Sequence, residues 1–254
     1  MSSNALDQFD SSAAGLRKIL ERIGWVVVVI LILTALVAIS IRSHLVLTAF
    51  ANGAANAANG LDDFDVRYVE HPLATLAHLI PGFLIVLIGP TQFIRSFRKR
   101  WSVLHRWAGR VFIVCGTMGA LTGFFIGALY PFTGFGARGF NQAMATVFIA
   151  SFTLCSLYNA YSNIRARCFG NHREWMIRAW AIMLSIATER IFLGIMGSFT
   201  PMDFADFFGT TFWVAAVIHI IVAEYWINLT RTSRNGARHW KDLDRSSVGV
   251  AEGS

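Results

Sequence analysis

The apolar stretch "GWVVVVILILTALVAISI", residues 24–41, decides the fold class of this chain. It contains no charged side chain, and its length approaches the ~20 residues that an α-helix needs to cross the hydrocarbon core of a bilayer. Backbone N–H and C=O groups find no water in that core, so a spanning segment must satisfy them internally, as a helix does. The stretch therefore predicts a transmembrane helix.

Similar apolar stretches recur along the 254 residues, of which 55% are hydrophobic and only 15% are charged. This composition is typical of integral membrane proteins. Hydropathy predicts six spans, near Gly24–Ile41, His71–Phe93, Leu104–Tyr130, Asn141–Asn163, Met176–Ser198 and Thr210–Asn228. We therefore expect an all-α, polytopic membrane protein with six transmembrane helices in one bundle.

The segments between the spans are too short to fold alone. We expect a cytoplasmic tail over residues 1–22, the transmembrane domain over 23–230, and a basic, largely disordered tail over 231–254. The first apolar run is longer than the h-region of a usual secretory signal, so we expect it to be retained as an anchor.

The net charge of +7 reflects orientation in the membrane. Lysines and arginines gather in both tails and in alternate connections between spans, whereas the opposite connections contain only Arg42, Arg67 and Arg138. An excess of positive charge marks cytoplasmic segments. We expect both termini in the cytoplasm, a location in the bacterial inner membrane, contact with the lipid bilayer and no binding of nucleic acid.

Glycines repeat every four residues in the third span, at Gly119, Gly123 and Gly127. One stripe of this helix therefore lacks side chains. Close packing against a neighbouring helix is the expected use of such a stripe. A flat cofactor lying against the backbone is the alternative.

Ionisable side chains lie at membrane depth in several spans, where each costs about 2.5–3.5 kcal/mol on insertion scales. Four of them are about equally far from the outer ends of their helices: His78, Glu189, Arg190 and His219. At ~1.5 Å of rise per residue they lie at similar depth. We expect one outer cluster, in which Arg190 pairs with a carboxylate or a bound acidic group.

A second polar group is predicted at the cytoplasmic ends of the spans. It contains Gln92, His105, Arg106, Arg110, His172, Arg173 and Arg178, with Glu224 close by. In "GNHREWMIRAW", residues 170–180, Asn171 and Glu174 have the spacing of a capping box at the start of a helix. His172 has no such structural explanation. Two histidines on different helices at similar depth, here His105 and His172, suit bis-imidazole coordination or a proton relay.

The stretches "IGPTQFIRSFRKRWSVLHRWAGRVF" (Ile88–Phe112) and "HREWMIRAWAI" (His172–Ile182) resemble a family of predicted bacterial multi-pass membrane proteins known as a domain of unknown function. Its motifs here are GPxQF, HRxxGR and HxxWMxR, and the resemblance extends from about His71 to Glu224. The resemblance implies a functional interest in His78, Gln92, His105, Arg106, Arg110, His172, Trp175, Met176, Arg178, Arg190 and Glu224. It implies no established activity.

A small helical bundle with histidines near both faces is also distantly similar to the di-haem b-type cytochromes. Those proteins often have two histidines about four turns apart on one helix. His71 and His78 are seven residues apart, which is only two turns. The chain departs from the cytochrome pattern at this point.

Three functions remain open from the sequence. The most specific is electron transfer with haem b or a quinone, with His105 and His172 as an inner pair and His78, with His219, as an outer pair; His78, His105 and His172 are then the expected metal ligands. The cofactor's polar groups would bind Gln92, Arg106, Arg110, Arg178 and Arg190. The alternatives are a transporter, channel or proton-coupled sensor with a polar intramembrane path, and an accessory subunit of a membrane complex or homo-oligomer. No nucleophile and base share a defined spacing that would support processing of a lipid or peptide. The sequence does not decide whether the protein is an enzyme.

Overall fold

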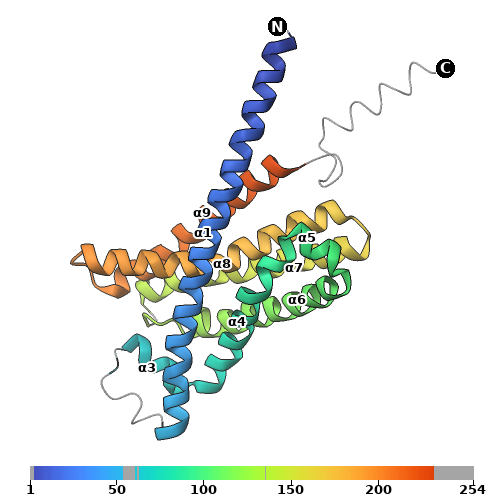
Figure 1. Cartoon of the computed structure of the whole chain (residues 1–254). Helices are drawn as coiled ribbons and strands as arrows, with labels where there is room; N and C mark the ends of the chain where they lie inside the picture. Colours follow the sequence, from blue (N-terminus) through green and yellow to red (C-terminus); the bar gives the residue numbers. More distant parts are fainter. Residues whose placement is uncertain (1–2, 54–60, 62, 135, 232–254) are drawn as a thin grey trace, which may run out of the picture.

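The computed structural model describes residues 3–53, 61, 63–134 and 136–231, and the regular elements within them are helices (Figure 1). In chain order these are α1 (Ser3–Asn52), α3 (Asp63–Glu70), α4 (Pro72–Phe93), α5 (Arg95–Arg100), α6 (Ser102–Phe124), the π-helix η1 (Phe125–Leu129), α7 (Ala137–Arg165), α8 (Phe169–Phe199) and α9 (Phe204–Thr230).

Six of these helices are long and apolar enough to cross a membrane. This confirms the predicted all-α fold with six spans. We call the end of the bundle that contains α5 and residues 166–168 the inner end, and the end that contains α3 the outer end. Under the predicted orientation the inner end faces the cytoplasm, and that orientation stays a prediction.

The first helix is longer than its hydropathy signal. Residues 24–41 predict a single span, but α1 runs without interruption from Ser3 to Asn52. Most of the predicted tail 1–22 therefore continues the helix of the first span. Of the predicted C-terminal tail, residues 232–254 lie outside the described residues.

Helix α8 lies at the centre of the bundle, since it packs against α7, α9 and α1, while α4 packs against α6 and α1. Figure 1 shows α6, α7, α8 and α9 running alongside one another in alternating directions, with α1 crossing them obliquely. The interior face of α8 carries small or compact residues such as Ala179, Ile182 and Ser185, each 0% exposed. Small side chains let helix backbones approach closely, which favours association in a membrane.

Large apolar side chains cover the outside of the bundle. Val26 on α1, Val114 on α6 and Ile221 on α9 are 60%, 57% and 61% exposed. In water such a surface would be unfavourable by about 25 cal/mol for each Å² of apolar area. Around membrane-spanning helices it is the surface that contacts lipid.

The glycine stripe of α6 and η1 is filled by side chains of neighbouring helices. A Cβ atom added at Gly116 would lie 2.8 Å from Leu157, and one added at Gly127 would lie 2.9 Å from Thr146. At Gly123 the same atom would lie 3.1 Å from the imidazole of His78. The glycines thus allow close packing, and side chains occupy the space along the stripe.

The predicted capping box at the start of α8 is wrong. The helix begins at Phe169 after Cys168, so Asn171 lies inside the first turn. Glu174 binds the guanidinium of Arg231 instead of turning back to the helix terminus. Two hydrogen bonds from a cationic guanidinium contribute more than one bond from a neutral backbone N–H, which explains why the tertiary contact prevails.

Candidate functional site

His172 is held at the inner end of the bundle in a defined tautomer. Its Nδ1 atom lies 2.9 Å from the backbone oxygen of Ala160 on α7. A carbonyl oxygen only accepts hydrogen bonds, so Nδ1 carries the proton and donates it. The Nε2 atom of the neutral ring therefore keeps its lone pair and is able to accept a proton or bind a metal.

His105, near the start of α6, lies at the same inner end of the bundle as His172. No hydrogen bond joins the two imidazoles within the described part of the chain, and their pairing as ligands stays a prediction. The Nδ1 atom of His105 is buried and has no hydrogen-bond partner among the described residues. A buried polar atom without a partner costs free energy, and a bound ligand, ion or water molecule is one explanation for it.

Two further contacts continue this polar region toward the membrane interior, between α4, α6 and α8. The amide oxygen of Gln92 lies 3.3 Å from the position of a Cβ atom added at Gly109, one turn beyond His105. About one turn deeper, the indole nitrogen of Trp180 lies against Gly89, where an added Cβ would be only 2.2 Å away. We call the six residues Gly89, Gln92, His105, Gly109, His172 and Trp180 the inner column. It extends ~10 Å along α4 and α6.

Trp180 closes the deep end of the inner column. Its ring stacks on Phe93 with 4.9 Å between centroids. Its Nε1–H group is buried without a partner among the described residues. Since an indole N–H only donates, Trp180 offers an unused hydrogen-bond donor in an apolar setting.

The three sequence motifs converge in the inner column. Gly89 and Gln92 come from GPxQF, His105 and Gly109 come from HRxxGR, and His172 comes from HxxWMxR. Residues from three helices that are distant in sequence therefore line one region. The arginines of HRxxGR do not join them: Arg106 and Arg110 are exposed, and the Arg110 guanidinium lies over Trp107 at 4.7 Å.

His78 lies at the outer end of the bundle, against α6. Its Nδ1 atom is 3.0 Å from the hydroxyl oxygen of Thr122. That hydroxyl donates its own proton to the Met118 carbonyl at 2.7 Å, so it accepts from His78. The Nε2 atom of His78 therefore carries the lone pair, as it does in His172.

Glu189 and Arg190 form an ion pair at the same end of the bundle as His78. The Glu189 carboxylate is 0% exposed and lies 3.2 Å from the guanidinium of Arg190. Neither carboxylate oxygen makes a hydrogen bond within the described part of the chain. Arg190 also hydrogen-bonds the Tyr68 side chain of α3 and interacts electrostatically with Asp65. Arg190 thus pairs with the carboxylate next to it in sequence, whereas the sequence favoured a carboxylate or acidic group from outside its own helix.

A second ion pair joins α3 to the first span. Arg42 of α1 pairs with Asp65 of α3 and lies over the ring of Tyr68 at 4.7 Å. Because Tyr68 also contacts Arg190, the short helix α3 links α1 to α8 at the outer end. We call His78, Glu189, Arg190, Tyr68 and Asp65 the outer cluster.

His219 does not reach the outer cluster. Its Nε2 atom lies 2.7 Å from the hydroxyl of Thr188, on the side of α8 that faces α9. His78, by contrast, packs against α6. The described contacts do not bring these two histidines together, and their pairing as outer ligands stays a prediction without geometric support.

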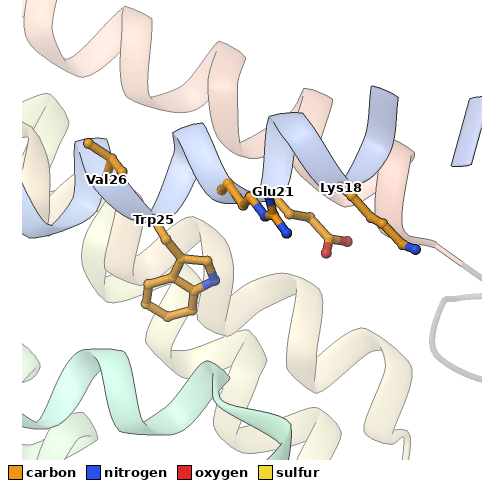
Figure 2. A pocket seen from close by; sticks show the side chains of 5 residues that line it. Lys18, Glu21, Trp25 and Val26 are labelled. Atoms are coloured by element: carbon orange, nitrogen blue, oxygen red, sulfur yellow. The ribbon is translucent and has the colours of Figure 1, made fainter. Parts of the chain in front are cut away.

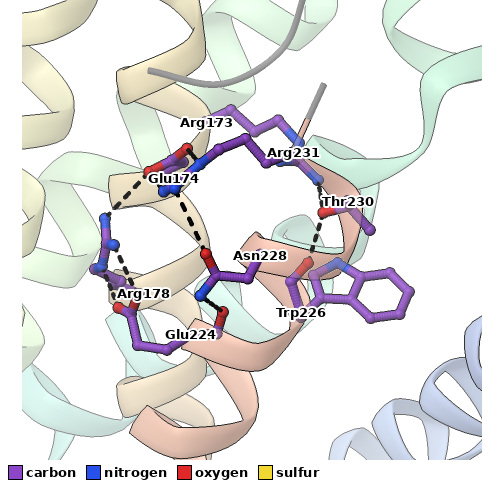
Figure 3. A network of polar contacts seen from close by, with 8 residues as sticks. All are labelled: Arg173, Glu174, Arg178, Glu224, Trp226, Asn228, Thr230 and Arg231. Carbon is purple, nitrogen blue, oxygen red and sulfur yellow. Dashed lines mark hydrogen bonds and ion pairs between the residues drawn. The ribbon is translucent and has the colours of Figure 1, made fainter. Parts of the chain in front are cut away.

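Charged side chains at the inner ends of α8 and α9 form a separate network (Figure 3). The buried Glu174 carboxylate accepts two hydrogen bonds of 2.8 Å from Arg231. The Glu224 carboxylate accepts bonds of 2.5 and 3.0 Å from Arg178, whose guanidinium also lies 4.7 Å from the Trp175 ring. The hydrogen bond with Glu174 raises the pKa of Arg231 further above its ordinary value.

This network fixes the role of Arg178. Sequence reasoning places it among the cofactor-binding residues and Glu224 near the inner group, and the structure shows the two bound to each other. Figure 3 shows both side chains pointing toward each other, with Arg231 reaching back to Glu174. The positive charges of Arg178 and Arg231 are thus already balanced by buried or partly buried carboxylates.

No group of three or more His, Cys, Asp or Glu side chains that could hold a metal ion occurs among the described residues. His105 and His172 both lie at the inner end, and His78 belongs to the outer cluster. A hollow on α1, lined by Lys18, Glu21, Arg22, Trp25 and Val26, includes no residue of either region (Figure 2).

Sequence reasoning did not select Trp180, Thr122 or Arg231. By its position in the sequence, Trp180 is explained as part of the aromatic belt at the membrane surface, and Arg231 as one of the positive charges of a cytoplasmic segment. Thr122 belongs to an apolar span and carries no charge. Only the residues that contact them, Gly89, His78 and Glu174, reveal what these residues do.

A family model described as "Predicted membrane protein (DUF2306)" matches residues 75–227 of the chain, which is more than half of it. The match includes the inner column, together with His78, Glu189 and Arg190, and leaves out α1 and α3. None of the curated proteins and none of the solved structures compared with the chain matches it. The distant similarity to di-haem cytochromes stays a prediction.

Proposed function

The chain belongs to this DUF2306 family of predicted membrane proteins, and from its inner column we propose that it is a bacterial inner-membrane protein that binds a quinone and takes part in electron transfer. The observation that carries the proposal is the buried Trp180 N–H group, which has no partner, in the same column as the unpartnered Nδ1 atom of His105.

A quinone head group matches this arrangement chemically. It is a flat, largely apolar ring with carbonyl oxygens that accept hydrogen bonds. Ligand sites in proteins are typically apolar with a few well-placed polar groups. In the inner column Trp180 supplies a donor from α8 and His105 supplies a ring nitrogen from α6, while Phe93 supplies an aromatic face.

Reduction of a quinone to a quinol consumes two electrons and two protons. The electrons would come from a partner protein that carries a redox group. The protons must cross from water to the carbonyl oxygens, and His172 lies at the inner end with a free lone pair on Nε2. An imidazole with one protonated and one free ring nitrogen is able to take up a proton at one nitrogen and release another from the other.

A quinone fits the described residues better than haem b does. Of the cations expected to hold haem propionates, Arg178 is bound to Glu224 and Arg190 is paired with Glu189. Arg106 and Arg110 are exposed on α6, outside the inner column. A porphyrin also needs a broad flat slot. The glycine stripe that offered one is filled by side chains, His78 among them.

Extraction of the purified protein with organic solvent, followed by mass spectrometry, tests the proposal directly. We expect about one quinone per chain from a bacterial membrane preparation. A short-chain quinone should quench part of the tryptophan fluorescence, and Trp180→Phe should weaken its binding by about tenfold through loss of one hydrogen bond. Trp107→Phe is the matched control, because Trp107 is 59% exposed on the lipid side.

An oxidised and a reduced visible spectrum complete the experiment. A Soret band that corresponds to one haem per chain would show that the cofactor is haem b and not a quinone. A colourless protein that neither retains nor binds quinone would refute the redox function, and the accessory role in a membrane complex would then take its place.

A proton-linked transport or sensing function is the second candidate, because the Glu189 carboxylate is fully buried without a hydrogen bond. An intramembrane carboxylate in this setting is able to bind and release a proton during transport. Glu189→Gln should abolish proton flux in proteoliposomes that contain a pH-sensitive dye. Glu70→Gln, an exposed change at the same end of the bundle, should not. Equal flux in both variants would count against the path.

A further inference from the structure

Helix α5 and the first turns of α6 carry a dense positive surface at the inner end of the bundle. We call it the basic surface; it consists of Arg95, Arg98, Lys99, Arg100, Arg106 and Arg110 with the neighbouring Trp101 and Trp107. We propose that the basic surface binds the head groups of anionic phospholipids. The proposal does not depend on the quinone site.

The first argument is uncompensated charge. Residues 94–112 contain six cationic side chains and no acidic one. All six are exposed, and none forms an ion pair with any residue in the described part of the chain. The arginines of the α8–α9 network have carboxylate partners by contrast, so the basic surface gathers six cations without any such compensation.

The second argument is the position of the basic surface between two spans. Helix α4 ends at Phe93 and α6 begins at Ser102, so the six residues of α5 connect two membrane-crossing helices at one interface. A segment in this position lies at the level of the lipid head groups. Its cations are therefore next to phosphate groups rather than in bulk water.

The third argument is the apolar component of the same surface. Ile94, Trp101 and Trp107 are 41%, 53% and 59% exposed. The Arg100 guanidinium lies 5.8 Å from the Trp101 ring, and that of Arg110 lies 4.7 Å from Trp107. Such pairs present an apolar body to the acyl chains and a cation to the head group, as interfacial tryptophan and arginine side chains do.

These features select a lipid among the polyanions. Nucleic acid also binds clustered arginines, but its site is a surface that water reaches freely. Here exposed aliphatic and indole groups alternate with the cations along the start of a transmembrane helix. An amphipathic anion, with a phosphate joined to acyl chains, matches both components. Each cation near an anionic membrane surface contributes about 1 kcal/mol, which corresponds to a roughly fivefold preference per residue.

Brominated lipids provide the test, because bromine quenches nearby tryptophans. The full chain is reconstituted in vesicles in which either phosphatidylglycerol or phosphatidylcholine is brominated, at about a one-to-two ratio of the first to the second. We expect stronger quenching by brominated phosphatidylglycerol, and weaker preference at high salt as charges are screened. The double variant Arg98→Gln, Lys99→Gln should lower the preference by about 25-fold, which is fivefold for each cation removed.

Two variants make the result specific. Arg165→Gln with Arg167→Gln removes two exposed cations from the α7–α8 connection, at the same end of the bundle, and should leave the preference unchanged. Exchange of the two cations, Arg98→Lys with Lys99→Arg, should also preserve it, even if the glutamine variant folds poorly. Equal quenching by the two lipids in the unmodified protein would overturn the proposal. The same loss in the control pair would overturn it as well, by showing a general effect of net charge. Displacement of brominated phosphatidylglycerol by an oligonucleotide at equal charge concentration would replace the lipid by nucleic acid.

Discussion

Removal of Arg231 should destabilise the bundle by leaving a buried carboxylate without its main partner. The Glu174 side chain is only 6% exposed and that of Arg231 is 23% exposed. Both carboxylate oxygens accept hydrogen bonds of 2.8 Å from this one guanidinium. The nearest remaining cation is Arg178, at 3.9 Å from Glu174 and already bound to Glu224.

The magnitude follows from these contacts. A hydrogen bond to a charged group contributes about 1.5–3 kcal/mol, so the two bonds together set an upper value of ~3–6 kcal/mol. Partial exposure of Arg231 screens the attraction, and Arg178 compensates part of the uncovered charge. We expect Arg231→Met to cost about 2–3 kcal/mol, which corresponds to a fall in Tm of roughly 5–10 °C for a chain of this size.

Thermal unfolding in detergent, followed by intrinsic fluorescence, measures the change. Arg165→Met is the matched control, since Arg165 is exposed at the end of α7 and has no ion pair among the described residues. It should change stability by less than about 0.5 kcal/mol. The double variant Arg231→Met, Glu174→Gln should be more stable than Arg231→Met alone, because the amide of glutamine is less costly to bury than an unpaired charge.

Two results would refute this reasoning. Equal Tm values for Arg231→Met and Arg165→Met would mean that the buried pair contributes nothing beyond an exposed cation. Additive effects of Arg231→Met and Glu174→Gln in the double-mutant cycle would mean that the two side chains do not interact.

Further substitutions test the interior. Gly89→Ala should cost about 1–3 kcal/mol of stability and shift the fluorescence of Trp180, because the new methyl group overlaps the indole nitrogen. Gly82→Ala is the control: an added Cβ there has nothing within 4 Å, so stability and fluorescence should not change. Equal effects in the two alanine variants would contradict the packing of Trp180 on Gly89. Arg190→Met should cost about 3–5 kcal/mol as it leaves the Glu189 carboxylate buried alone. Glu189→Gln should cost less, because Arg190 keeps its other partners in the outer cluster, and thermal melts of the two variants measure the difference. The reverse order of stabilities would show that Arg190 depends on Glu189 alone.

The six spans could be predicted from the sequence because a lipid environment permits few backbone conformations. A long apolar segment in a bilayer must form a helix that satisfies its own backbone groups, so composition and run length alone predict six spans. The ends were less readable. Residues 24–41 are the apolar part of α1, but helical hydrogen bonding continues from Ser3 to Asn52 through polar residues that hydropathy excludes.

The sequence predicted at which end of the bundle each polar residue lies, but not which side chain it contacts. Residue type and distance along a helix predict that His105 and His172 lie at one end and that His78 and Arg190 lie at the other, and the structure agrees. Rotation about each helix axis and the packing of neighbours decide which side chains meet, and these depend on contacts between residues far apart in sequence. This is why His219 meets Thr188 rather than His78.

Contacts between distant residues also explain why the polar stretch at residues 170–180 was predicted only in part. The sequence by itself determined that this stretch begins a membrane helix and that His172 needs a special explanation. Only the tertiary structure decided that Glu174 binds Arg231 rather than the helix terminus, and that Trp180 lies on Gly89 with its N–H group unused. A local pattern fixes a helix through the hydrogen bonds of its own backbone, whereas a buried polar side chain takes the partner that the whole bundle places beside it.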